Sequence, residues 1–116
     1  MEKVLEDIAG LKGVQGSLLI GKDGLLILSL GDFQNDVELI SACVSEVYAS
    51  ADSMTNERFD NGHPFEMMIS ANNQNIFIFD VNEDTILAVV SDDTVNRGFV
   101  TMHGRASAIE LKSMLS

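Results

Sequence analysis

Two neighbouring segments of this chain, residues 76–79 and 86–90, are apolar at every position. Successive side chains of a strand point to opposite faces of a sheet, so a strand with this pattern needs an apolar cover on both sides. Both segments are short and are flanked by polar turns, which favours strands over helices. A sheet with one face in water would instead alternate apolar and polar residues. The pattern therefore predicts a sheet that is covered by a layer on each face.

The turns between the apolar segments predict how the strands connect. Asp23-Gly24 lies between residues 17–20 and 25–28 and is a strong hairpin signal. Further along, short polar turns join three more segments, and short turns connect antiparallel neighbours. We therefore expect five strands, of which the last three form an antiparallel meander at residues 65–70, 75–81 and 85–91.

Helical spacing of apolar residues predicts three helices, over residues 1–9, about 36–57 and about 94–115. The order is then helix, two strands, helix, three strands, helix, which supplies helices for both faces of the sheet. We expect an α/β (α+β) fold, a three-layer sandwich with a five-stranded, mostly antiparallel sheet. The whole chain, residues 1–116, is expected to form a single domain.

The two longer helices have predicted caps and core-facing stripes. Asn35 or Asp36 can accept from the free amides that begin the second helix, and Asp92 and Asp93 can do so for the third. Gly104 weakens the third helix by about 1 kcal/mol relative to alanine. The predicted core stripes are Val37, Ile40, Val44, Val47, Ala51 and Met54 in the second helix, and Val95, Phe99, Met102, Ala106 and Ile109 in the third.

The balance of charge excludes several classes of function. The chain has 18 acidic and 7 basic residues and a net charge of -11, and a nucleic-acid backbone would repel such a surface. Between Lys22 and Arg97 the one basic residue is Arg58, so the middle of the chain presents acids, either for solubility or to steer a basic partner. The chain has no apolar run of membrane-spanning length, and its acidic first residues lead us to expect no signal peptide. We expect a cytoplasmic protein without nucleic-acid binding or membrane insertion.

Residues 16–23 nearly match the phosphate-binding loop G-x-x-x-x-G-K-[ST]. The last position is Asp23, where the motif needs a hydroxyl group that binds magnesium. The four spacer residues also form a predicted strand, and a second strand follows where the motif has a helix. These departures exclude nucleotide binding at this segment.

The residue types that most often perform catalysis or bind metals have simpler roles in this sequence. His63 in a polar loop and His103 in a helix are expected to be exposed, and neither belongs to a nucleophile motif. Cys43 is the single cysteine, which excludes an internal disulfide, and we expect it to be a small buried hydrophobe. The acidic clusters at 82–84 and 92–93 fit turns and caps better than a calcium loop. We predict no catalytic residue, no cofactor and no metal site.

Two features of the sequence predict contact with a second copy of the chain. The segment 65–70 opens the meander, is mostly apolar and has a single charge, at Glu66, and an apolar sheet edge invites pairing with another strand. On the second helix, a row rich in small residues would let another helix approach closely, although the same row also suits a solvated face. The predicted homodimer interface comprises Leu39, Ala42, Glu46, Ala49, Ser53, Phe65, Glu66, Met67, Met68 and Ile69.

Three short segments resemble a known family. They are Gly13-Val14-Gln15-Gly16-Ser17, Asp23-Gly24 with its flanking strands, and Asn96-Arg97-Gly98-Phe99-Val100 at the start of the last helix. Together with the order of elements, they make nearly the whole chain resemble the roadblock/dynein light-chain domain, including its prokaryotic regulators of Ras-like small GTPases. The resemblance implies a homodimer that joins third strands into one sheet and packs its central helices side by side. It also implies that there is no active site.

The resemblance further implies a partner. We expect a non-catalytic homodimeric regulator or scaffold that binds a Ras-like small GTPase, either stimulating its GTP hydrolysis or only holding it. A structural scaffold without a GTPase and a small-ligand sensor are the alternatives. We expect no arginine finger, because Arg58 and Arg97 suit capping or surface roles. The candidate partner-binding residues are Asp36, Glu38, Asp52, Glu57 and Arg58.

Overall fold

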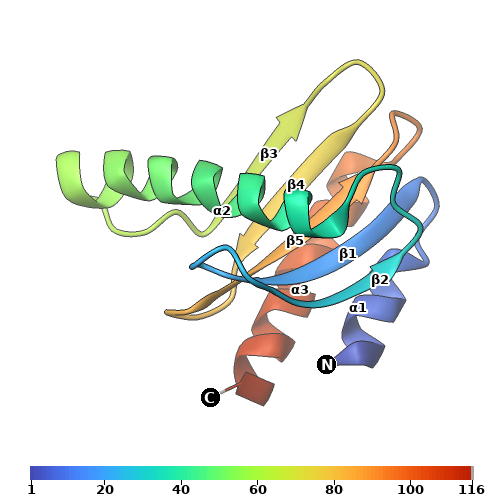
Figure 1. Cartoon of the computed structure of the whole chain (residues 1–116), viewed down its shortest axis with the longest axis horizontal. Coiled ribbons are helices and arrows are strands. Elements are labelled where there is room, and N and C mark those ends of the chain that lie inside the picture. Colours follow the sequence, from blue (N-terminus) through green and yellow to red (C-terminus); the bar gives the residue numbers. More distant parts are fainter. Residues whose placement is uncertain (116) are drawn as a thin grey trace.

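A five-stranded antiparallel sheet lies between helices in the computed structural model, which describes residues 1–115 (Figure 1). The strand order β2-β1-β5-β4-β3 places β3 at one edge of the sheet, and it confirms the predicted hairpin, meander and fold class. The elements are α1 (Glu2–Ala9), β1 (Val14–Gly21), β2 (Leu26–Gly31), α2 (Val37–Asp52), the π-helical segment η1 (Ser53–Arg58), β3 (Glu66–Ser70), β4 (Asn75–Asp80), β5 (Thr85–Ser91) and α3 (Arg97–Leu115).

The sheet separates two hydrophobic cores. Leu19 and Phe77 point to the side of α1 and α3, while the adjacent Leu18 and Ile78 point to the side of α2. In Figure 1, α2 accordingly crosses one face of the sheet, and α1 and α3 lie on the other. The prediction of a three-layer arrangement is confirmed, because strands that are apolar on both sides leave no face for water.

Asn96 caps α3, and the predicted caps Asp92 and Asp93 were wrong. The Asn96 side-chain oxygen accepts a hydrogen bond from the backbone N–H of Phe99 at 3.0 Å. Asp92 instead accepts from the hydroxyl group and the backbone N–H of Thr94, at 2.6 and 2.9 Å, in the turn that precedes the helix. These two bonds hold the pKa of the Asp92 carboxyl below its ordinary value. The helix therefore begins later than the acidic pair indicates.

The buried face of α3 is also different from the predicted stripe. Val100, Gly104 and Leu111 lie against the sheet. Gly104 makes this possible, because a Cβ atom there would lie 2.1 Å from Cζ of Phe79, a contact that no packed core tolerates. Among the predicted stripe residues, Val95 is half-buried. The others are exposed: Phe99, Met102, Ala106 and Ile109.

The predicted core stripe of α2 was right in part. Val44 is buried, but Val47 and Met54 are 39% and 47% exposed. The remaining predicted members are half-buried: Val37, Ile40 and Ala51. The helix is therefore rotated about its axis relative to the prediction, so that one apolar side faces away from its own core.

Polar residues occupy the core positions of α2 that the sequence pattern missed. Ser41 and Ser45 are buried, and the Ser41 hydroxyl donates to the carbonyl of Val37 at 2.8 Å. Tyr48 is buried with its hydroxyl donating to the carbonyl of Pro64 at 3.0 Å. A hydroxyl that bonds within the protein can be buried at little cost, so these residues pack as well as hydrophobic ones.

Candidate interaction surface

Strand β3 is an apolar edge with unpaired backbone groups. Asp80 donates its backbone N–H to the carbonyl of Phe65 at 3.0 Å, and hydrogen-bonded pairs alternate along an antiparallel ladder. The backbone groups of Glu66, Met68 and Ser70 therefore point away from β4, toward the free edge. Phe65 and Met68 are 76% and 47% exposed. This edge can pair with a strand of another chain.

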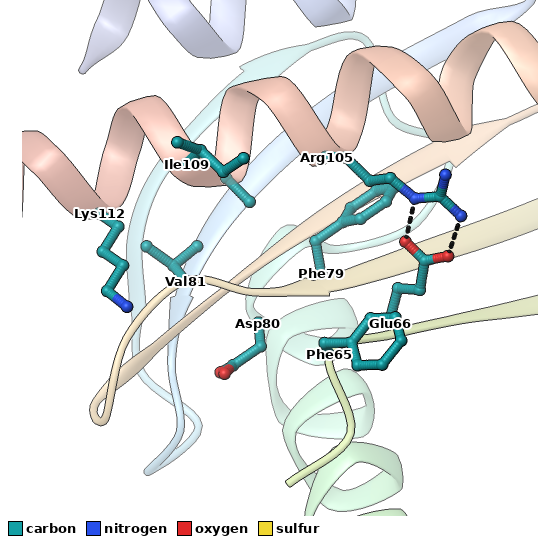
Figure 2. A pocket seen from close by; sticks show the side chains of 9 residues that line it. Phe65, Glu66, Phe79, Asp80, Val81, Arg105, Ile109 and Lys112 are labelled. Carbon is teal, nitrogen blue, oxygen red and sulfur yellow. Dashed lines mark hydrogen bonds and ion pairs between the residues drawn. The ribbon is translucent and has the colours of Figure 1, made fainter.

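The one charge in β3 does not protect the edge. Glu66 accepts two hydrogen bonds from the guanidinium group of Arg105, at 2.6 Å from Nε and 2.5 Å from Nη2 (Figure 2). The pair draws the carboxylate toward α3 and neutralises it there. Arg105 thereby holds the pKa of the Glu66 carboxyl below its ordinary value. An edge strand usually carries a free charge that deters pairing, and β3 has none.

The Glu66–Arg105 pair makes a testable pH prediction. Because the folded-state pKa of Glu66 is lowered, the pair stabilises the fold above the ordinary glutamate pKa of about 4.3 and is lost as the pH falls through the lowered pKa. We expect Glu66→Gln to melt at a lower temperature than the unmodified chain at pH 7. The difference should be modest, because both groups touch solvent, and should vanish in strong acid.

Thermal unfolding followed by circular dichroism from about pH 2 to 7 measures this effect. Arg105→Gln is the matched control: it should reproduce the loss, and the double variant should lose little more than either single one. A difference between Glu66→Gln and the unmodified chain that stays constant across this range would contradict the assignment.

Helix α2 presents an apolar flank to the same side of the molecule as β3. Leu39, Cys43, Val47 and Met54 follow at spacings of four, four and seven residues, which places them above one another along the helix. All four are exposed, Leu39 to 57%. The prediction that Cys43 is buried was therefore wrong. A groove of about 180 Å³ beside this flank is lined by Leu39, Ile40, Cys43, Val44, Ile76 and Val90 together with Asn35 and Gln74.

The predicted small-residue row runs along α2 beside this apolar flank and shares Leu39 with it. Leu39, Glu46 and Ala49 are exposed, and Ala42 and Ser53 are half-buried. The sequence analysis did not predict that Val47, Met54 and Cys43 are exposed. Their helical spacing placed Val47 and Met54 in the core stripe and Cys43 beside it. The candidate surface therefore joins the small-residue row, the apolar flank of α2 and the edge of β3.

The segment between η1 and β3 is fixed to α2 and η1 and sets the position of the edge strand. Besides the Tyr48–Pro64 bond, Asp52 Oδ1 lies 2.5 Å from Nδ1 of His63, and the Thr55 hydroxyl donates to the Gly62 carbonyl at 2.9 Å. These three contacts tie successive residues of the loop to one side of the helix. The helix and the edge strand are thus held as one surface.

Tyr48 is at the centre of this attachment. The ammonium group of Lys22 lies 4.9 Å from the centre of its ring and also pairs with Asp80 at 2.7 Å. Burial, together with the charges of Asp80 and Asp52, raises the pKa of Tyr48, so its hydroxyl stays protonated and keeps donating to Pro64. The contact persists throughout the physiological pH range.

The predicted partner-binding residues lie along the length of α2 and η1 and form no single cluster. Asp36 caps the helix, accepting from the N–H of Glu38 at 3.0 Å, which confirms one of the two predicted caps. Asp52 is tied to His63. Glu57 and Arg58 are exposed at the far end, in η1, roughly 30 Å from Asp36 at 1.5 Å rise per residue. The acids are therefore spread along the length of α2 and η1, and this set is called the acidic α2 ridge below.

The acidic clusters that could suggest a metal have turn roles. Asn82 accepts from the backbone N–H of Asp84 at 2.9 Å, as Asp92 does from Thr94. Across residues 1–115, histidine, cysteine and carboxylate side chains nowhere gather in threes around a point that could hold a metal ion. Over the same residues, each helix is too short or too polar to cross a bilayer.

A helix-covered antiparallel sheet with an open third strand defines a class of small α+β domains. The Roadblock/LC7 domain model matches residues 1–91, and the chain belongs to the Roadblock/LC7 domain family. The uncharacterized protein MJ0714 of Methanocaldococcus jannaschii is 31% identical over 114 residues, which cover 98% of this chain and 95% of that protein. MJ0310 of the same organism is 30% identical over 114 residues, covering 98% of each chain.

Solved structures share the fold at lower identity. Myxococcus xanthus MglB superposes with a TM-score of 0.89 at 18% identity and covers 97% of this chain and 92% of its own. The gliding protein mglB of Thermus thermophilus gives 0.85 at 18% identity, over 97% and 85% of the two chains. A Roadblock/LC7 domain from Streptomyces avermitilis gives 0.89 at 15% identity, over 99% and 97%. The overall arrangement of helices and strands is thus common to these proteins.

Proposed function

We propose that the chain is a non-catalytic homodimer that binds a Ras-like small GTPase on its acidic α2 ridge. The observation that carries the dimer is the unprotected apolar edge of β3 beside the exposed apolar flank of α2. The family assignment and the shared fold with MglB support the proposal. The resemblance set out above implies the GTPase partner.

The dimer joins β3 to β3 of the second copy about a two-fold axis near Met68. The outward backbone groups of Glu66, Met68 and Ser70 supply the hydrogen bonds, and two edges become the centre of one continuous sheet. Met67 packs on the α2 side of the sheet, so the two apolar flanks of α2 meet above the new strand pair. Each copy thus covers the exposed apolar surface of the other.

The GTPase docks through charge and apolar contact together. Between Asp36 and Glu57 the chain has five acidic and no basic residues, and dimerisation doubles this acidic surface. A GTPase with basic residues beside its nucleotide-responsive segments is steered toward such a ridge. Charge then sets mainly the rate of association and the orientation, while apolar contacts set the lifetime of the complex.

Reversing two acids on the ridge should slow association with the GTPase. We expect Glu38→Lys combined with Glu57→Lys, two exposed acids outside the predicted dimer interface, to lower the association rate about tenfold at low salt and much less at high salt. The matched control is Glu2→Lys combined with Glu6→Lys, two exposed acids on α1, which lies on the opposite face of the sheet. It has the same net charge and should keep most of the rate.

The measurement begins with a pull-down from the native cytosol, read by mass spectrometry. A recovered Ras-like GTPase is then purified, loaded with GTP or GDP, and tested for association by biolayer interferometry. An equal loss of rate in both double variants would contradict docking on the ridge. A pull-down without a GTPase, by an intact homodimer, would favour the structural-scaffold alternative.

A further inference from the structure

Helix α3 carries an apolar stripe on the side opposite its own core. Phe99, Met102 and Ile109 are 44%, 58% and 72% exposed, and Ala106 between them is exposed as well. The buried side of the same helix is formed by Val100, Gly104, Ser107, Ala108 and Leu111. An outward helix face is normally polar, so this one indicates a surface that is covered when the protein functions.

The spacing of the stripe indicates what covers it. Residues 99, 102, 106 and 109 follow at steps of three, four and three, which are the a and d positions of a heptad repeat. This average spacing of 3.5 residues matches the seam between two helices that pack side by side. A flat sheet or a small ligand could cover apolar residues without this regular spacing of 3.5 residues. The partner surface is therefore a helix.

The charges beside the stripe fit a second copy of α3 in the parallel orientation. Arg105 occupies a g position and Glu110 the following e position. In a parallel helix pair, a g residue faces the e residue five positions later on the partner, so two-fold symmetry forms the Arg105–Glu110 pair twice. In an antiparallel pair on this stripe, g positions face g positions, so Arg105 would face the Arg105 of the second copy, which carries the same charge.

Arg105 can make this contact while it holds Glu66. It uses Nε and Nη2 for the two oxygens of Glu66, and its third nitrogen points away from that carboxylate (Figure 2). The side chain is 60% exposed. The intramolecular ion pair fixes the guanidinium beside the stripe, so little side-chain entropy is lost when a second carboxylate arrives.

We propose that α3 is a second self-association surface, at which two copies of the chain pair their α3 helices in parallel through Phe99, Met102, Ala106 and Ile109. It lies on the opposite face of the sheet from α2 and depends neither on the GTPase nor on the β3 contact. A single helix face is smaller than a standard stable interface, which buries about 800 Å² per partner. The contact is consequently weak by itself and links β3-paired dimers at high concentration.

Cysteine cross-linking tests both the contact and its orientation. Met102→Cys is made in a Cys43→Ser background, so that the single thiol lies on the stripe. Parallel pairing places the two thiols opposite each other, and a disulfide should form about tenfold faster than in the matched Met114→Cys chain. Met114 is 50% exposed on the same helix but off the stripe. Equal rates in the two chains would overturn the proposal. So would a Met102→Cys chain that cross-links faster to an Ala106→Cys chain, whose thiol it would face in an antiparallel pair, than to a second Met102→Cys chain.

Sedimentation of the full chain separates this contact from the β3 contact. The unmodified chain should show species larger than a dimer at high concentration, and Met102→Glu should remove them and leave the dimer. Met114→Glu should change nothing. A chain that stays dimeric at every concentration, or whose α3 stripe binds only vesicles or an unrelated protein, would overturn the proposal. If Met102→Glu yields monomers, the dimer itself is formed by α3 pairing, and the β3 contact proposed above is wrong.

Discussion

Met68→Pro is expected to convert the homodimer to single chains while each chain stays folded. The backbone N–H of Met68 points to the free edge, so proline removes no hydrogen bond to β4, and proline is tolerated on edge strands in this orientation. In the two-fold pair, two intermolecular bonds of about 1 kcal/mol each are lost, which weakens association roughly 30-fold before any clash of the ring is counted.

Sedimentation equilibrium measures this change, with circular dichroism to confirm the fold. Met68→Thr is the matched control: it removes the same apolar side chain but keeps the N–H, and it should retain most of the dimer. A proline variant that dimerises like the unmodified chain would show that the β3 edge is not the contact. Loss of the dimer in both variants would assign the contact to the side chain of Met68 and contradict backbone pairing.

Gly104→Ala is expected to destabilise the fold by about 2 kcal/mol and to lower the melting temperature by roughly 8 °C. Alanine improves helix propensity by up to about 1 kcal/mol at an exposed position, so the expected sign is the reverse of the usual one. The added methyl group would lie 2.1 and 2.2 Å from two ring carbons of Phe79, which is only 2% exposed and has no room to move. The whole helix must shift outward to relieve the clash.

Gly98→Ala is the control on the same helix, since the nearest atom to its Cβ, Oδ1 of Asn96, would lie at an ordinary 3.7 Å. It should leave the melting temperature unchanged or slightly raised. Combining Gly104→Ala with Phe79→Leu should cost less than the sum of the two single changes, because the smaller side chain makes room for the methyl group. Additive losses would show that Gly104 acts through the backbone and not through Phe79.

The fold was predictable because the apolar pattern of the strands determines which layers must cover the sheet. The apolar residues of β4 and β5 alternate between two cores, and Asp23-Gly24 reverses the chain with Gly24 at a φ of +96°, which an L side chain rarely adopts. The apolar edge of β3 was predictable too, since short turns fix the order of a meander. These are local properties, and a one-residue shift of a strand would reverse both faces.

The orientation of the helices was less predictable, because α2 and α3 each have two apolar sides. Val47 and Met102 fit helical core stripes as well as any buried residue does, yet both are exposed. Helical spacing identifies a stripe without saying whether its own chain or another covers it. The mistaken core stripes are therefore informative, because they mark the surfaces proposed here for self-association.

The sequence alone determined that five strands form a sheet covered on both faces, because a strand that is apolar at consecutive positions excludes water from both sides. The tertiary structure decided which side of each helix enters the core. That choice depends on contacts between residues far apart in the chain: Gly104 admits the ring of Phe79, and the Tyr48 hydroxyl reaches Pro64. Periodicity along one helix contains no information about such partners, because it records the polarity of each side chain and not the shape of the surface that meets it.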